Sequence, residues 1–177
     1  MILENDIESD RIRLSQFTER DISNIYLGWL ADVNINRYLE VRFTEFNEVR
    51  AKEYIRRCID SPNIFFLKII SREGKFIGTC TVNHNTFHKT AEIGLMIGDS
   101  NFHGRGLGSE VIGLLVRLCC SQLFVRKVSA GLYSSNKPSL KAFLKNGFII
   151  ESKLSSEVLL EGKPEDTYRL SYYCKDN

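Results

Sequence analysis

The stretch AEIGLMIGDSNFHGRGLGSEVIGLLVRL, residues 91–118, decides the fold because it joins an apolar strand, a short polar loop and an amphipathic helix. Gly104, Gly106 and Gly108 keep Cβ atoms out of the loop, so its backbone N–H groups can face one concave surface. The helix that follows adds unpaired amides and the positive end of its dipole, and Arg105 adds a positive charge. The pattern predicts a binding site for a diphosphate.

Other phosphate-binding loops use the same physics but differ in sequence. A GxxxxGK[ST] match is absent, and GRGLGSE lacks the GxGxxG spacing. The loop also follows three predicted strands of a meander, whereas a dinucleotide-binding loop opens a first βαβ unit. The alternative is a tight turn without a ligand.

The rest of the sequence predicts one domain, residues 1–177, of the α+β class with a mixed sheet of about seven strands flanked by helices. Hydrophobic periodicity indicates strands at 12–17, 64–71, 76–83, 91–98 and 127–133. A closing pair of strands follows, with 148–154 and 157–160 before the turn at 161–164 and 167–173 after it. Helices are expected at 19–31, 47–60, 108–124 and 138–145, with Asp32 to Asn36 ending the first.

Composition excludes several classes of protein. The net charge is +2 without a basic run, which argues against a nucleic-acid partner. The N-terminus does not resemble a signal peptide, and no apolar run reaches about 18 residues, so we expect a cytoplasmic protein that does not enter the membrane. His84, His88 and His103 fit no zinc spacing, so no metal is expected. The five cysteines are expected to be buried, reduced and structural: Cys58, Cys80, Cys119, Cys120 and Cys174.

Two motifs carry a resemblance to a known family. HGRGLGSE resembles the acetyl-CoA pyrophosphate loop of GNAT acetyltransferases, Q/R-x-x-G-x-G/A, from which only His103 departs. NKPSLKAFLKNGF, residues 136–148, resembles the family's asparagine helix, which contacts the pantetheine arm. RIRLSQFTERD near the start and EGKPEDTYRLSYY near the end resemble the RimJ/RimL-type branch, so the likeness spans about residues 11–173.

The resemblance implies a GNAT fold, in which a strongly twisted sheet has splayed fourth and fifth strands and the thioester lies in the gap between them. LMIG at 95–98 and SAGLY at 129–133 match those strands. The residues implied to bind acetyl-CoA, the expected co-substrate, are Met96, Ile97, His103, Gly104, Arg105, Gly106, Leu107, Gly108, Asn136 and Ser139.

Direct acetyl transfer needs a base for the amine and a proton for the departing thiolate. Glu92 is the first choice of base, acting through water, and a structural role is its alternative. Many family members place an acidic tyrosine where this chain has Phe143. Tyr133 is the substitute acid, and a core aromatic or a water donor is the alternative.

The amine acceptor is expected to meet the segment NINRYLEVRFTEFN, residues 34–47. Arg37, Tyr38, Glu40 and Arg42 give it an aromatic and bipolar lining, which suits a small-molecule amine such as a nucleotide-linked amino sugar. A solvated connector is the alternative role for the segment. Two other functions stay open, a protein N-terminal acetyltransferase and a catalytically silent acyl-CoA-binding module, and the sequence also leaves a homodimer open.

Overall fold

A computed structural model describes residues 1–43 and 47–175. Its strands form one sheet in the order β1-β2-β3-β4-β5-β6-β8-β7. The strands are β1 (Ile7–Glu8), β2 (Ile12–Gln16), β3 (Ile64–Ser71), β4 (Phe76–Asn85), β5 (Thr90–Ile97), β6 (Lys127–Tyr133), β7 (Ile149–Leu160) and β8 (Lys163–Tyr173). The α-helices are α1 (Asn24–Ala31), α2 (Val33–Asn36), α3 (Glu48–Asp60), α4 (Leu107–Arg117) and α5 (Lys137–Lys145).

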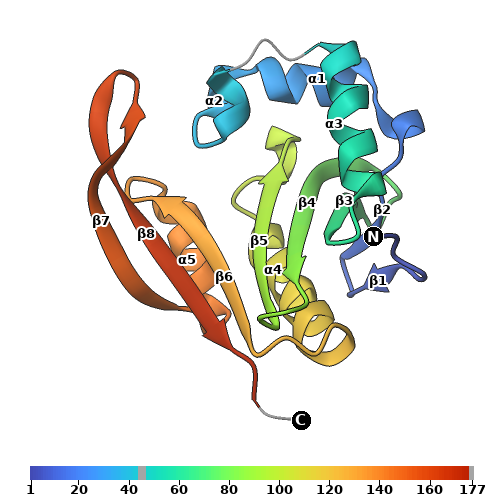
Figure 1. The fold of residues 1–177 in the computed structure, drawn as a ribbon. Coiled ribbons are helices and arrows are strands. Elements are labelled where there is room, and N and C mark those ends of the chain that lie inside the picture. Colours follow the sequence, from blue (N-terminus) through green and yellow to red (C-terminus); the bar gives the residue numbers. More distant parts are fainter. Residues whose placement is uncertain (44–46, 176–177) are drawn as a thin grey trace.

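The sheet splits between β5 and β6. These two strands are parallel and pair only from Thr90–Lys127 to Glu92–Ser129, whereas every other neighbouring pair is antiparallel. Beyond Glu92 the strands diverge, and Figure 1 shows β6, β8 and β7 turning away from β5. The predicted divergence of the strands that carry 95–98 and 129–133 is confirmed.

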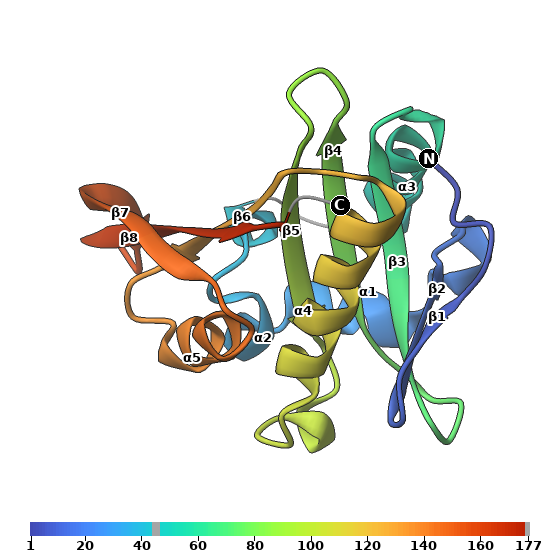
Figure 2. The same ribbon diagram turned by 90° about the horizontal axis from the view of Figure 1, so that it is seen from below.

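Helices cover both faces of the sheet. On one face, α4 and α5 pack over a large core to which Val111, Leu115 and Phe143 contribute (Figure 2). On the other face, α1 and α3 bury a second cluster that includes Tyr26, Ile55 and Met96. Because alternate residues of a strand face opposite sides, β5 serves both clusters, and Met96 reaches the second.

Close packing fixes α1 at the end of β5. Ser23 accepts a hydrogen bond from the Tyr26 amide at 3.2 Å and so caps the helix. Trp29 then lies directly on Gly98, where any Cβ would collide with the indole ring. A side chain at position 98 would therefore push α1, and the segment after it, away from the splayed strands.

Four elements differ from the predicted ones. The helix predicted at 19–31 is a 3-10 turn, η1 (Glu19–Asp21), followed by α1, because Ile22 and Ser23 adopt extended backbone conformations between the two. β1 has two residues and gives the sheet eight strands instead of about seven. Asp32 does end α1, but its carboxylate accepts a hydrogen bond from the Asn34 amide at 2.8 Å and starts α2, which the 3-10 helix η2 (Glu40–Phe43) follows. β7 is one strand with an irregularity at Ser156, whose φ is 52°, and this explains the predicted break near residues 155–156.

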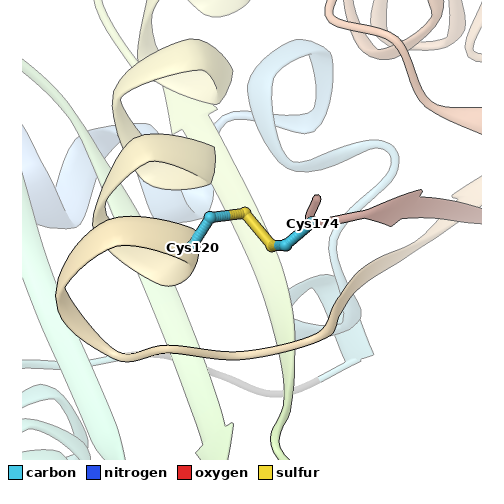
Figure 3. The surroundings of a disulfide bond; sticks show 2 residues. All are labelled: Cys120 and Cys174. Carbon is cyan, nitrogen blue, oxygen red and sulfur yellow. A yellow bond between two sulfur atoms is a disulfide. The ribbon is translucent and has the colours of Figure 1, made fainter. Parts of the chain in front are cut away.

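The prediction for the cysteines is wrong at two positions. Cys120 and Cys174 form a disulfide with a Cα–Cα distance of 5.6 Å, which ties the π-helical turn after α4 to the end of β8 (Figure 3). This pairing could not be predicted from local patterns because 54 residues separate the two cysteines. Cys58, Cys80 and Cys119 are free and buried as expected, and burial raises the pKa of Cys119 to about 12.

Candidate active site

The glycine-rich loop forms an open cradle at the start of α4. Gly104 and Gly106 have φ angles of +71° and +76°, which favour glycine, and no protein atom lies closer than 4.0 Å to a Cβ built on either. Gly106 is the N-cap of α4 and offers no side-chain hydrogen bond, so the first helical amides have no cap. Gly108 has no such backbone requirement. Two glycines and an uncapped helix terminus thus fit the diphosphate of coenzyme A.

Arg11, which the sequence did not single out, braces this cradle from the turn between β1 and β2. Its Nη1 donates to the carbonyl of Arg105 at 3.0 Å, and its Nε donates to Glu110 Oε2 at 2.7 Å. Ser9 donates to the other oxygen of Glu110 at 2.5 Å. Desolvation would raise the pKa of Glu110, but the hydrogen bonds from Ser9 and Arg11 hold it below the ordinary value. A charged carboxylate therefore anchors Arg11 beside the loop.

Two predicted loop residues make protein contacts. A ring nitrogen of His103 lies 2.8 Å from the carbonyl oxygen of Ile97, which joins the loop to the end of β5. The Arg105 guanidinium lies 5.4 Å from the ring centroid of Phe102. Leu107, the first residue of α4, is buried in the core, so its backbone rather than its side chain faces the cradle.

The gap between the splayed strands brings Met96 and Tyr133 opposite each other. Glu92 pairs with Ser129, and four residues further along each parallel strand are Met96 and Tyr133. Both side chains are buried, and both lie on the sheet face covered by α1, since they are an even number of residues from that pair. Tyr133 thus sits across the gap from the predicted thioester position.

The hydroxyl of Tyr133 is held between two charged side chains of η2. It donates to Glu40 Oε1 at 2.6 Å and accepts from Arg42 Nη2 at 2.6 Å. Burial and the hydrogen bond to Glu40 raise the pKa of Tyr133 above its ordinary value, against a smaller opposing effect of Arg42. The structure therefore brings together Tyr133, Glu40 and Arg42, which the sequence assigned to separate roles.

The arginines of the acceptor segment have protein partners. Arg42 also donates to the carbonyls of Leu39 at 3.1 Å and Leu159 at 3.0 Å, which clamps η2 to the β7–β8 hairpin. Arg37 pairs with Glu161 at 3.2 Å and lies 5.5 Å from the ring centroid of Tyr38. Residues 44–46 of the segment lie outside the described residues.

A cavity of about 330 Å³ opens beside Met96 on the α1 face of the sheet. Its described lining contains no charged side chain and consists of Tyr26, Leu30, Leu39, Val41, Tyr54, Phe66, Thr79, Cys80, Thr81, Gly94, Leu95 and Met96. A second, larger cavity of about 840 Å³ lies between the segment 30–43 and the tip of the β7–β8 hairpin, and Leu30 borders both.

Glu92 lies apart from this arrangement. Its side chain is 54% exposed and pairs with Arg169 Nη1 of β8 at 3.3 Å. It shares the sheet face of Met96 but stands at the point where β5 and β6 still pair, four residues from Met96. Its predicted role as the base stays a prediction, and the ion pair with Arg169 is compatible with the structural alternative.

The asparagine helix has the expected local structure. Asn136 caps α5 by accepting a hydrogen bond from the Ser139 amide at 3.3 Å. Phe143, at the position of the usual tyrosine, is 1% exposed and packs on Phe148 with ring centroids 4.9 Å apart. Phe143 is therefore a core residue.

Two further observations concern a metal ion and a membrane, neither of which was expected from the sequence. Within the described ranges, no three His, Cys, Asp or Glu side chains gather in a way that could hold a metal ion. No helix of those ranges has the length and apolar character needed to span a membrane.

Comparisons with known proteins show the family and confirm the predicted GNAT fold. The model of the acetyltransferase (GNAT) domain matches residues 11–149. An N-acetyltransferase 9-like protein of Nematostella vectensis is 40% identical over 155 residues, which cover 86% of this chain and 67% of that protein. An L-amino acid N-acetyltransferase of Escherichia coli is 25% identical over 118 residues, 65% of this chain and 72% of that protein.

A solved structure extends the likeness in fold. The spermidine N-acetyltransferase of Vibrio cholerae, in complex with CoA and spermine, superposes with a TM-score of 0.84 at 17% identity, over 93% of this chain and 96% of that one. With the family model matching most of the sequence, the chain belongs to the GNAT acetyltransferases and is an acetyl-CoA-dependent N-acetyltransferase.

Proposed function

We propose that this enzyme acetylates the α-amine of a polypeptide whose first side chain is large and apolar. The observation that carries the proposal is the uncharged cavity of about 330 Å³ that reaches β5 at Gly94, Leu95 and Met96, where this strand no longer pairs with β6. An apolar side chain gains about 25 cal/mol for each Å² that it removes from water, whereas a charged group would lose its hydration there without a partner.

The contacts of the arginines argue against a nucleotide-linked amino sugar. A phosphate would need guanidinium groups that are free to form bidentate hydrogen bonds. Arg42 instead binds Tyr133, Leu39 and Leu159, and Arg37 pairs with Glu161. A polyamine would likewise need carboxylates. The described lining of the 330 Å³ cavity has none, and Glu161 at the larger cavity pairs with Arg37.

The larger cavity gives room for the chain that follows the first residue. It continues from Leu30 toward the hairpin tip, between Phe43 and Leu159, and both of these side chains are exposed. The E. coli relative is named as an L-amino acid N-acetyltransferase, and an amino acid presents the same α-amine as a protein N-terminus.

The loop residues 103–108 and the first amides of α4 would hold the pyrophosphate of acetyl-CoA, and Asn136 and Ser139 the pantetheine arm. Bound acetyl-CoA supplies an acetyl group on a thioester. The backbone of Met96 and Ile97, at the edge of β5 that β6 has left, would orient the carbonyl beside the acceptor. We further propose that residues 1–177 form a single cytoplasmic domain of the RimJ/RimL-like branch.

An acceptor panel tests the function. Free coenzyme A thiol and the mass gain of one acetyl group are measured with peptides that begin with Phe, Leu, Gly or Glu, with free phenylalanine, with spermidine and with a nucleotide-linked amino sugar. We expect the highest kcat/KM with the Phe- and Leu-first peptides. Turnover confined to the amino sugar or to spermidine would overturn the proposal.

A matched pair of variants tests whether the first side chain of the acceptor enters the cavity of about 330 Å³. Gly94→Val adds bulk at the cavity wall, where an added Cβ would lie 3.2 Å from Thr81 Oγ1. Gly28→Val adds the same bulk where an added Cβ would meet nothing within 4 Å beyond the backbone of its own helix. Gly94→Val should raise KM for the Phe-first peptide about tenfold, a loss of about 1.4 kcal/mol, and leave the Gly-first peptide unchanged. An equal effect on both peptides would place the first side chain elsewhere.

A further inference from the structure

We propose that the hydroxyl of Tyr133 passes the acceptor's proton to Glu40, and that Arg42 is the positioning residue that holds this hydroxyl in place. The three groups form a continuous chain, with 2.6 Å from Arg42 Nη2 to Tyr133 Oη and 2.6 Å from Tyr133 Oη to Glu40 Oε1. The proposal concerns the proton path of the transfer reaction, so it holds for any amine acceptor.

The position of Tyr133 suits this role. Its ring is buried and lies across the gap from Met96, on the sheet face that carries the acceptor cavity. Leu39 and Val41, on either side of Glu40 in the sequence, line that cavity. The relay therefore stands at the junction of the acceptor site and the splayed strands.

The directions of the hydrogen bonds also suit it. A phenolic oxygen has one proton and two lone pairs. Its proton is given to Glu40 and one lone pair accepts from Arg42, which leaves the second lone pair for an ammonium proton. Proton transfer along the chain then needs no rearrangement of the protein.

The two ends of the chain differ in exposure. The side chain of Arg42 is 13% exposed and is fixed by the carbonyls of Leu39 and Leu159, whereas the side chain of Glu40 is 73% exposed. A proton that arrives on Glu40 can leave to water. The neighbouring charged side chains of β8 are held elsewhere. Glu165 accepts from the Ser134 hydroxyl and the Ser135 amide, and the Asp166 carboxylate pairs with Lys153 at 2.6 Å.

The protons and electrons of the reaction balance. The amine nitrogen forms a bond to the acetyl carbon, and the carbon–sulfur bond breaks with its electron pair left on sulfur. Two protons leave the nitrogen, of which one ends on sulfur and one reaches solvent. Tyr133 Oη accepts the proton that will reach solvent, and at the same time its own proton moves to Glu40 Oε1. The tyrosine is neutral before and after the reaction.

The pH profile tests the relay. With the relay in place the ammonium form of the acceptor reacts, so kcat/KM should stay flat as the pH falls from about 7 to about 6, because an α-ammonium is intact below about 7.7. Glu40→Gln and Tyr133→Phe should each lose roughly 10²-fold at pH 6 and fall tenfold per pH unit below the amine pKa, since the free amine alone then reacts.

Because the two residues act in series, the double variant should lose no more than either single variant. Glu157→Gln, which removes an exposed carboxylate of β7, is the matched control and should keep the flat profile. Retention of the flat profile by Glu40→Gln, or additive losses in the double variant, would overturn the relay.

Absorbance titration gives a readout independent of turnover. The difference between wild type and Tyr133→Phe isolates the ionisation of Tyr133. Since the hydrogen bond and charge of Glu40 raise the pKa of Tyr133, Glu40→Gln should lower it, and Glu157→Gln should not. An unchanged Tyr133 pKa in Glu40→Gln would show that the two groups are not joined in solution, and would overturn the proposal even if activity fell.

Discussion

Gly106→Ala tests the diphosphate cradle most cleanly, because the protein contains a matched glycine elsewhere. Gly106 has a φ of +76° and Gly74, in the turn between β3 and β4, has a φ of +81°. Neither position has a protein atom closer than 4.0 Å to an added Cβ. An alanine at either position should therefore cost the same backbone strain, about 1–2 kcal/mol, which lowers Tm by roughly 2–8 °C.

The two variants should differ in ligand binding. At Gly106 the new methyl group projects into the cradle, so the Kd of acetyl-CoA should rise at least about tenfold, or about 1.4 kcal/mol. At Gly74 the Kd should stay that of wild type. Calorimetry measures both affinities, and thermal unfolding checks that the strain is equal. Equal Kd values for the two variants would refute the assignment of the loop to the pyrophosphate.

Four other changes follow from the same geometry. Arg11→Ala should raise KM for acetyl-CoA roughly fivefold with kcat unchanged, because the loop loses hydrogen bonds worth about 1 kcal/mol. Arg13 is similarly exposed, and Arg13→Ala should leave KM unchanged. The same KM in both variants would remove Arg11 from the site. Glu92→Gln should lower kcat/KM at neutral pH by less than about fivefold, because Glu92 forms an exposed ion pair with Arg169. A fall of about 10²-fold or more would instead identify Glu92 as the base. Asn136→Ala should lower stability by about 1 kcal/mol because α5 loses its N-cap, whereas Asn136→Ser keeps the cap. A raised KM for acetyl-CoA in the serine variant would show that Asn136 binds the pantetheine arm in addition to capping the helix. Cys120→Ser should lower stability by about 4 kcal/mol, which is the loop-closure entropy expected for a disulfide that spans 54 residues. A reductant should destabilise wild type and leave the variant unchanged. A wild type that does not respond to reductant would contradict a disulfide in solution.

Much of the fold could be predicted because local patterns determine it. The apolar segments 64–71, 76–83 and 91–98, which turn residues separate, predicted β3, β4 and β5 within two residues at either end. The glycine loop identified the start of α4 for the same reason, since positive φ angles and a helix N-terminus leave a local signature. A strand of two residues and a helix of four, such as β1 and α2, are too short to show any periodicity.

The acceptor site was less predictable because it depends on contacts between distant segments. Arg42 and Tyr133 are 91 residues apart and Arg42 and Leu159 are 117 apart. Sequence reasoning chose Arg37, Tyr38, Glu40 and Arg42 for their chemistry, but it had no means of telling that both arginines would find protein partners. The apolar cavity could not be predicted because its lining comes from many elements. Each of α1, α3, β3, β4 and β5 supplies only a few residues, while Leu39 is the residue before η2 and Val41 lies at the start of η2.

The most direct measurement is a crystal structure with a bisubstrate ligand, in which coenzyme A is joined through an acetyl group to the α-amine of a Phe-first peptide. We predict the pyrophosphate on the amides of residues 104–108, the phenylalanine ring in the cavity between Thr79 and Met96, and the amide nitrogen beside Tyr133 Oη. A phenylalanine ring outside that cavity, with the nitrogen remote from Tyr133, would contradict both the proposed acceptor and the site on which it rests.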